Sequence, residues 1–190
     1  MKLLFLLPLI AMAAMPAAVE SPAKAERSAP APLSDRQKVL AVATSQVGTV
    51  EKTGRNDGEV DKYLAAVGLG GTRNPYCAAC VYWIGREALG SRNPYPKSAW
   101  SPDMLKGGVR VTEGTVIKGG ETFGIYFPNK GRIAHTGLVE RRDGSCFVTL
   151  EGNTSPQAAA GSAKDRDGDG FWRKRRPWRT IHSTKDWLAK

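Results

Sequence analysis

Five residues of this 190-residue chain, three cysteines and two histidines, are of the types that pair a nucleophile with a base. The cysteines are Cys77, Cys80 and Cys146, and the histidines are His135 and His182. An odd number of cysteines leaves at least one thiol without an intramolecular disulfide partner. A thiolate nucleophile activated by histidine is one use for such a thiol, and only two imidazoles are available as the base.

Cys77 stands at the predicted start of a helix over residues 77–89, which Gly90 ends. The free N–H groups and the positive dipole end of a helix N-terminus lower the pKa of a thiol placed there. Cys80 lies one turn further along, near Val81 and Ile84, so we expect it to pack in the core as a small hydrophobic residue. Cys77 is therefore the candidate nucleophile.

The sequence Cys77-Ala78-Ala79-Cys80 also permits other interpretations. A C-x-x-C pair that opens a helix is typical of thiol-disulfide oxidoreductases, but the helical stretch before it and the lack of a βαβ pattern argue against that class. Haem attachment would need a histidine after Cys80, where Val81 stands. Tetrahedral zinc would need two further ligands at close spacing, which the sequence lacks.

The elements that must position these residues change in character along the chain. Ser34 and Gln37 form a capping box that opens a helix ending at Gly48. A second helix is predicted over residues 58–67, and Ser101-Pro102 is expected to open a short one. The residues expected on the buried faces of the first two helices are Leu40, Ala43, Val47, Val60, Tyr63, Leu64 and Val67.

Beyond the short helix the apolar residues alternate, which predicts antiparallel strands separated by Gly- and Asn-rich turns. The alternating residues are Phe123, Ile125 and Phe127, then Ile133 and His135, then Phe147, Thr149 and Glu151. Helices first and strands after predict an α+β domain with N-terminal helices packed on an antiparallel sheet.

Three segments in this order resemble the CHAP family of cysteine, histidine-dependent amidohydrolases and peptidases. Residues 46–83 are similar to the N-terminal half of that family, residues 133–137 (IAHTG) to its His-bearing strand, and residues 149–154 (TLEGNT) to its next strand. The resemblance covers residues 36–182. It implies a papain-like fold and cleavage of amide bonds in peptidoglycan.

The resemblance implies four site residues: Cys77 as nucleophile, His135 as general base, Glu151 to orient the imidazole and Asn153 as an auxiliary polar group. Consecutive strands can bring His135 and Glu151 together on one face, and a carboxylate fixes the tautomer of the base in such triads. Papain-like enzymes use Asn or an acid for this purpose, so Asn153 stays an alternative to the preferred Glu151. His182, which follows the basic run, is expected at the surface.

No cofactor or metal is expected. Some CHAP domains bind calcium through acidic residues just before the cysteine, and residues 70–76 contain none. Asp165, Asp167 and Asp169 alternate as in part of a calcium loop, but the closing Glu of an EF-hand is missing, since Arg176 stands there. An Asp/Gly hairpin turn is the preferred interpretation.

The N-terminus has the layout of a secretory signal, with Lys2, an apolar run and an A-x-A site at residues 23–25. We therefore divide the chain into a signal peptide over 1–25, a Pro/Ala-rich linker over 26–33 and a catalytic domain over 34–190. The protein is expected to be secreted or periplasmic and monomeric, without stable membrane insertion. An uncleaved anchor is the alternative.

The formal net charge is +10, and removal of residues 1–25 leaves 26 basic and 17 acidic residues, or +9. An exported basic protein is drawn to polyanions, which outside a bacterial cytoplasm are wall polymers and lipid head groups more often than nucleic acid, although charge alone does not exclude nucleic acid. The resemblance implies peptidoglycan as the partner, and no nucleic-acid partner is expected. The basic run Arg173–Arg176 between Trp172 and Trp178 is interpreted as a solvated edge strand with two core-facing aromatics.

Three functions stay open at this point. The leading one is a hydrolase acting on peptidoglycan peptides through a thioester, as an endopeptidase or an N-acetylmuramoyl-L-alanine amidase. The others are a non-catalytic wall-binding module and a C-x-x-C oxidoreductase. The sequence specifies neither the bond that is cut nor whose wall is attacked, and it leaves the pairing of Cys80 and Cys146 open.

Overall fold

The computed structural model describes residues 31–158 and 161–189, and Pro32–Lys190 form one compact unit. The predicted signal peptide and linker residues 26–30 lie outside the described residues. In the described part, four α-helices and six strands alternate with short 3₁₀ turns. The helices are α1 (Asp35–Ser45), α2 (Asp61–Ala66), α3 (Cys77–Leu89) and α4 (Ala163–Arg166); the strands are β1 (Val109–Val111), β2 (Thr122–Phe127), β3 (Arg132–Asp143), β4 (Cys146–Thr154), β5 (Gly170–Pro177) and β6 (Ser183–Asp186).

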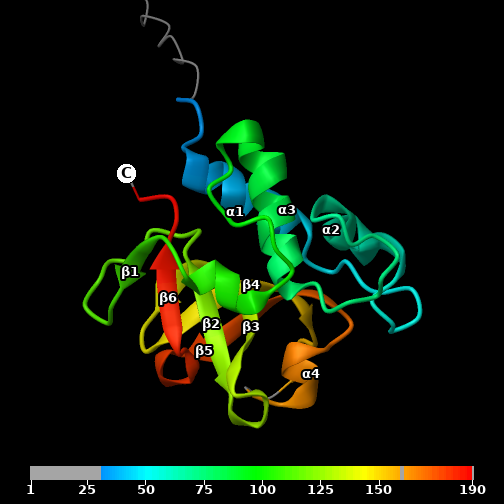
Figure 1. The fold of residues 1–190 in the computed structure, drawn as a ribbon. Coiled ribbons are helices and arrows are strands. Elements are labelled where there is room, and N and C mark those ends of the chain that lie inside the picture. Colours follow the sequence, from blue (N-terminus) through cyan, green and yellow to red (C-terminus); the bar gives the residue numbers. More distant parts are fainter. Residues whose placement is uncertain (1–30, 159–160, 190) are drawn as a thin grey trace, which may run out of the picture. The chain divides into compact units, whose positions relative to one another are not determined.

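The strands form one antiparallel sheet in the order β1-β6-β2-β3-β4-β5. Helices α1, α2 and α3 lie on one side of this sheet (Figure 1). The predicted α+β class, with N-terminal helices against an antiparallel sheet, is therefore confirmed. None of the helices in the described residues is long and apolar enough to cross a membrane.

Helix α1 begins as its capping box predicts: the Ser34 hydroxyl accepts from the Gln37 N–H, and the Gln37 side chain accepts from the Ser34 N–H. Its buried residues are Val39 and Ala43, whereas Val47 lies beyond the helix end and is exposed. The prediction that Val47 faces the core is wrong, because the helix ends at Ser45 and Val47 lies in the turn that follows it.

Helix α3 spans the predicted residues and is the central helix of the fold. It packs against α1 and α2 on one side and against β3 and β4 on the other. The main core lies between these layers and includes Tyr63, Leu64, Ile84, Leu138 and Leu150. Because α3 is the helix pressed onto β3 and β4, its first residue, Cys77, comes to lie beside the two strands expected to carry the other site residues.

Gly152 permits the close approach of α3 to β4, and Gly137 permits the close packing of β3 against β4. A Cβ on Gly152 would lie 2.7 Å from Cys80 Sγ, and one on Gly137 would lie 2.8 Å from the Leu150 carbonyl oxygen. Real Cβ atoms do not approach other atoms so closely. The absence of side chains at Gly152 and Gly137 therefore sets how near the helix and the two strands can come.

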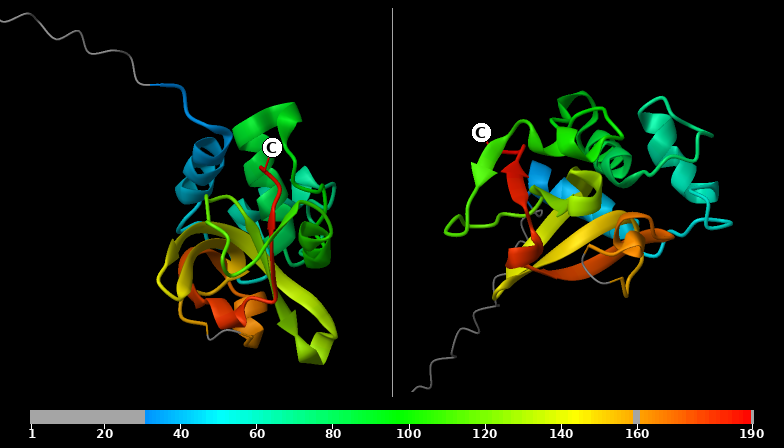
Figure 2. Two further views of the ribbon diagram at one scale, coloured as in Figure 1. Left: turned by 90° about the vertical axis from the view of Figure 1, so that its left-hand side faces the viewer. Right: turned by 60° about the horizontal axis from the view of Figure 1, so that its bottom comes forward.

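A second, smaller core fills the opposite face of the sheet, which is strongly twisted (Figure 2). Its buried residues are Phe123, Ile125, Phe127, Ala134, Val139 and Phe147, with Ile117, Trp178 and Ile181 packed against them. Residues of β3 and β4 thus contribute to both cores, which makes these strands a rigid support for His135.

The basic strand β5 is an edge strand, as predicted, but it is not solvated along both faces. Arg173 and Arg175 are exposed, whereas Lys174 and Arg176 are 8% and 2% exposed. Trp172 and Trp178 are only half-buried, and the buried aromatic of this segment is Phe171. The interpretation of a solvated edge strand is therefore wrong for Lys174 and Arg176, because successive side chains of a strand point to opposite faces and every second cation is buried.

Candidate active site

Cys77 occupies the first position of α3 and is 2% exposed. No side chain caps this helix, so its first N–H groups are free to face the sulfur. The Ser101 hydroxyl, which is also buried, lies 3.2 Å from Cys77 Sγ. A thiolate here would be stabilised by the helix N-terminus and by a neighbouring hydroxyl.

His135 lies in β3 and is fully buried. Its Nε2 is 2.8 Å from Glu151 Oε2 on the adjacent strand β4, as the two-strand argument predicts. The other nitrogen, Nδ1, is buried and has no hydrogen-bond partner among the described residues. Because Nε2 is held by the carboxylate, Nδ1 is the nitrogen left to exchange a proton with the Cys77 sulfur.

Cys77 and His135 shift each other's pKa values. Burial opposes ionisation of Cys77, but the adjacent imidazole of His135 and its charge, with help from Ser101 and the Thr136 backbone, outweigh it and lower the pKa of the thiol. Burial also opposes protonation of His135, yet Cys77 and Glu151 raise the pKa of the imidazole to about 9. Both pKa shifts are in the direction that favours a thiolate beside an imidazolium.

Glu151 is buried, and its two oxygens are fully engaged. Oε2 contacts His135 and Arg176 Nη2, while Oε1 accepts from Arg176 Nε at 2.5 Å and from the Thr149 hydroxyl. Burial alone would raise the pKa of Glu151, but the charge and hydrogen bonds of Arg176, then of His135, lower it strongly. Glu151 is thus held as a carboxylate in a fixed orientation.

A buried ion network continues behind Glu151. Arg176 binds the Asp165 carboxylate through Nη1 at 3.1 Å and Nη2 at 2.6 Å, and Lys174 Nζ lies 3.0 Å from Asp165 Oδ1. Burial of Arg176 is more than offset by Glu151 and Asp165, so the pKa of its guanidinium is raised. One arginine therefore bridges the carboxylate that holds His135 and a second carboxylate in α4.

Ser101, Asp165, Lys174 and Arg176 are the site residues that the sequence analysis did not identify. For the two cations a signal existed, because a strand of alternating burial cannot expose four successive basic residues. For Asp165 and Ser101 no local pattern exists, since their partners are 11 and 24 positions away in the chain.

Asn153 is not in contact with the histidine that it was expected to assist. Its backbone is left-handed, with φ at +60°, and its amide Nδ2 donates to the Arg166 carbonyl oxygen at 2.6 Å. Its Oδ1 is buried and has no hydrogen-bond partner among the described residues. Glu151, and not Asn153, orients His135, while Asn153 anchors the end of α4.

Cys77 opens onto a cavity of about 440 Å³, which gives a substrate access to the sulfur. Pro75 and Leu69 line it near the start of α3, and Trp100 and Ser101 line it from the 3₁₀ segment. This is the size of a small-molecule or peptide site.

All three cysteines are free thiols. Cys80 is fully buried, and its thiol donates to the Cys77 carbonyl oxygen at 3.0 Å, as in a helix turn. Burial, followed by the negative charge of Cys77, raises the pKa of Cys80 well above that of a free thiol. Cys80 therefore behaves as the small core residue expected from the sequence. Cys146 is buried at the start of β4.

The segment with three alternating aspartates does not form a simple hairpin turn, because it contains α4. Asp165 points into the ion network, away from any shared site with Asp167 and Asp169. Within residues 31–158 and 161–189, no three His, Cys, Asp or Glu side chains gather in a way that could hold a metal ion.

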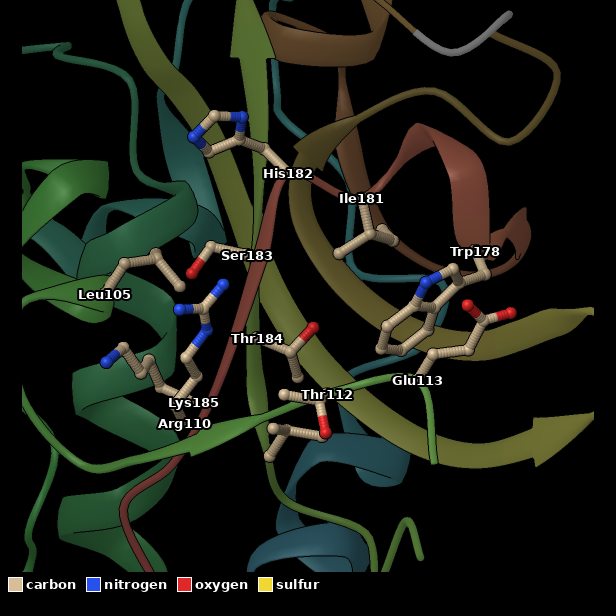
Figure 3. A pocket seen from close by; sticks show the side chains of 11 residues that line it. Leu105, Arg110, Thr112, Glu113, Trp178, Ile181, His182, Ser183, Thr184 and Lys185 are labelled. Carbon is tan, nitrogen blue, oxygen red and sulfur yellow. The ribbon is translucent and has the colours of Figure 1, made fainter. Parts of the chain in front are cut away.

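His182 is exposed and stacks on Tyr126, with 5.3 Å between ring centroids, as expected for a surface histidine. It lies at a different cavity of about 530 Å³ beside β1 and β6, together with Trp178 (Figure 3). Neither Cys77 nor His135 lines that cavity. His135 is therefore the only histidine beside the candidate nucleophile.

Comparison of the chain with protein-family models, curated proteins and solved structures finds no match.

Proposed function

We propose that this protein is a secreted cysteine hydrolase that cleaves amide bonds in peptidoglycan peptides, as an endopeptidase or an N-acetylmuramoyl-L-alanine amidase. The observation that carries the proposal is the buried line Cys77–His135–Glu151 at the edge of an open cavity. The pKa of each member is shifted toward the protonation state that nucleophilic acyl transfer needs.

The arrangement supports a papain-like, CHAP-type domain. A helix starts at the cysteine and packs on an antiparallel sheet whose successive strands carry the histidine and its carboxylate partner. This is also the chain order in which the resembling segments occur. The peptidoglycan substrate and the export of the chain come from that resemblance and from the N-terminal signal.

In the proposed reaction the Cys77 thiolate attacks the carbonyl carbon of the amide, and the Cys77 backbone N–H stabilises the developing oxyanion. The tetrahedral adduct collapses as the C–N bond breaks, and the His135 imidazolium gives its Nδ1 proton to the leaving amine. The product is a thioester on Cys77.

Hydrolysis of the thioester returns the groups to their starting state. Neutral His135 takes a proton from water as the oxygen attacks the thioester carbonyl, and the C–S bond breaks to release the acid. The Cys77 thiolate is regenerated beside the imidazolium. Through both steps the Glu151 carboxylate accepts from Nε2 and keeps the ring oriented.

A thiol-disulfide oxidoreductase has less physical support. Its second cysteine would need to attack a mixed disulfide, but Cys80 is buried, directed at a backbone carbonyl, and has a raised pKa. A non-catalytic wall-binding module would not need a thiol whose pKa is lowered by a histidine. For the variants below, each of these two alternatives predicts a result that differs from the one the hydrolase predicts.

The test is the release of soluble fragments from purified sacculi. We expect Cys77→Ser to abolish release and His135→Ala to reduce it by about 10²–10⁴-fold, the usual contribution of a general acid–base. Cys146→Ser is the matched control, because it makes the same exchange at a buried thiol outside the cavity. It should release fragments at the wild-type rate.

Release by Cys77→Ser at the wild-type rate would contradict the proposal. Thermal unfolding monitored by circular dichroism shows that each variant is folded before its activity is compared. Mass spectrometry of fragments from defined muropeptides then identifies the bond, since the endopeptidase and the amidase leave different new termini.

A further inference from the structure

Two arginines line the cavity that holds Cys77, and no Asp or Glu is among the described residues that line it. Arg132 comes from the first residue of β3, three positions before His135, and Arg166 comes from the last residue of α4. The cavity therefore carries positive charge from two separate elements, next to the candidate nucleophile.

Arg132 is held in place without a carboxylate partner. Its guanidinium carbon lies 3.9 Å from the centre of the Trp100 ring, and its Nη1 donates to the Ile133 carbonyl oxygen at 2.9 Å. It forms no ion pair with any residue in the described part of the chain. A guanidinium stacked on an aromatic ring keeps its remaining N–H groups in a fixed plane, ready for a planar anion.

Arg166 is positioned through its backbone. The Asn153 amide donates to the Arg166 carbonyl oxygen at 2.6 Å, which ties the end of α4 to the end of β4. The Arg166 side chain has one loose ion pair, 3.4 Å from the half-exposed Asp167. This pair leaves most of the hydrogen-bonding capacity of Arg166 for a ligand.

We propose that Arg132 and Arg166 form an anionic subsite, so that the preferred substrates are peptides with a free carboxylate close to the amide that Cys77 attacks. The inference rests on the proposed function and specifies its substrate class. Arginine suits this task because its planar fork binds a carboxylate through two parallel hydrogen bonds. Partial burial in the cavity strengthens such a bond compared with one in open solvent.

The two arginines also offset the repulsion between a substrate carboxylate and the Cys77 thiolate. A carboxylate near the thiolate would repel it and slow the attack, whereas a carboxylate held by a guanidinium adds no net charge. The subsite thus allows an acidic substrate to approach an ionised nucleophile.

The first experiment needs no knowledge of the substrate. Iodoacetate and iodoacetamide alkylate the same sulfur, but only iodoacetate is an anion. The rate of Cys77 alkylation by iodoacetate divided by the rate with iodoacetamide therefore reports the affinity of the cavity for an anion. Mass spectrometry of the Cys77-containing peptide separates this signal from Cys80 and Cys146. We expect the ratio to fall by about fivefold in Arg132→Gln/Arg166→Gln, the size of a partly exposed ion pair.

Arg110→Gln/Arg179→Gln removes the same number of positive charges at two exposed residues and is the matched control for net charge. Arg110 is exposed on β1, lines the other cavity and forms no ion pair with a described residue. The control should keep the wild-type ratio. An unchanged ratio in the double variant, or an equal fall in the control, would overturn the subsite.

The second experiment compares hydrolysis of a muropeptide with a free carboxylate beside the scissile amide and the same muropeptide with that group as a carboxamide. We expect a preference of about tenfold or more in kcat/KM for the free acid, lost in the double variant. Hydrolysis without preference, with an unchanged alkylation ratio, refutes the subsite and leaves the hydrolase. A changed ratio with no hydrolysis of any muropeptide refutes the hydrolase and leaves the subsite.

Discussion

His135 Nε2 and Glu151 Oε2 lie 2.8 Å apart on neighbouring strands, and both side chains are fully buried. Arg176 donates hydrogen bonds to the same carboxylate and also to the Asp165 carboxylate. The orientation of the imidazole is therefore set by a chain of charges that ends at Asp165 in α4. The pKa of His135, raised to about 9, follows first from Cys77 and then from Glu151, against the effect of burial.

Replacing Glu151 by Gln should shift the pH dependence of activity. The wild-type kcat/KM is expected to fall near pH 9, where the Cys77–His135 pair loses the imidazolium proton. Without the carboxylate the pKa of His135 falls, so the descending limb moves to lower pH. Fragment release measured from pH 5 to 10 checks this, with exposed Glu87→Gln as control. A descending limb at an unchanged pH would contradict the role of Glu151.

Two arginines on the same strand should differ in their contribution to stability. Arg176→Met leaves Glu151 and Asp165 as buried carboxylates without their shared cation, which costs about 3–5 kcal/mol of unfolding free energy. Arg175→Met removes only an exposed pair with Asp143 and should leave the free energy of unfolding nearly unchanged. Urea denaturation of the two variants measures the difference. Equal losses would mean that Arg176 does not neutralise the network.

A single methyl group at Gly152 should separate the helix from the sheet. Its Cβ would lie 2.7 Å from Cys80 Sγ, so α3 must shift and Cys77 must move relative to His135. We expect Gly152→Ala to raise the apparent pKa of Cys77 alkylation and to lower activity. Adding Cys80→Ala removes the clashing sulfur and should restore both.

Failure of that second substitution to restore either property would show that the spacing of α3 and β4 does not control the pair. Cys80→Ala alone is the control, and it should leave the alkylation profile of Cys77 nearly unchanged.

Acid should destabilise the protein through its buried carboxylates. The pKa values of Glu151 and Asp165 are lowered in the folded state despite burial, chiefly by Arg176. Their contribution is fully present above about pH 4, the unfolded value, and is lost as pH falls toward the folded values. Unfolding free energies should therefore decrease as the pH is lowered from about 4 to about 2, and Arg176→Met should show a shallower decrease. The same slope in both proteins would contradict this linkage.

Much of the fold could be predicted because the signals are local. The capping box of Ser34 and Gln37 opens α1, and the apolar period between Cys77 and Gly90 bounds α3. Alternation in β3 and β4 predicted that His135 and Glu151 share a face, and their hydrogen bond confirms this. These features depend on neighbours a few residues away or on consecutive strands.

The rest depends on contacts between distant segments. Arg176 could not be assigned to Glu151 without knowing that β5 pairs with β4, and the four-residue basic run suggested solvent instead. The role of Asn153 was misplaced because its left-handed backbone turns the amide toward α4. The position of Asn153 two residues after Glu151 did not indicate that its side chain points toward α4 instead of His135.

The most direct test of the ion pair is the rate of Cys77 alkylation by iodoacetamide as a function of pH, in the wild type and in His135→Ala. The wild-type rate should reach half its maximum well below pH 8.5, the value of a free thiol, and the variant should titrate at or above that pH. Coinciding profiles near pH 8.5 would contradict the account, because the histidine would then contribute nothing to ionising the sulfur.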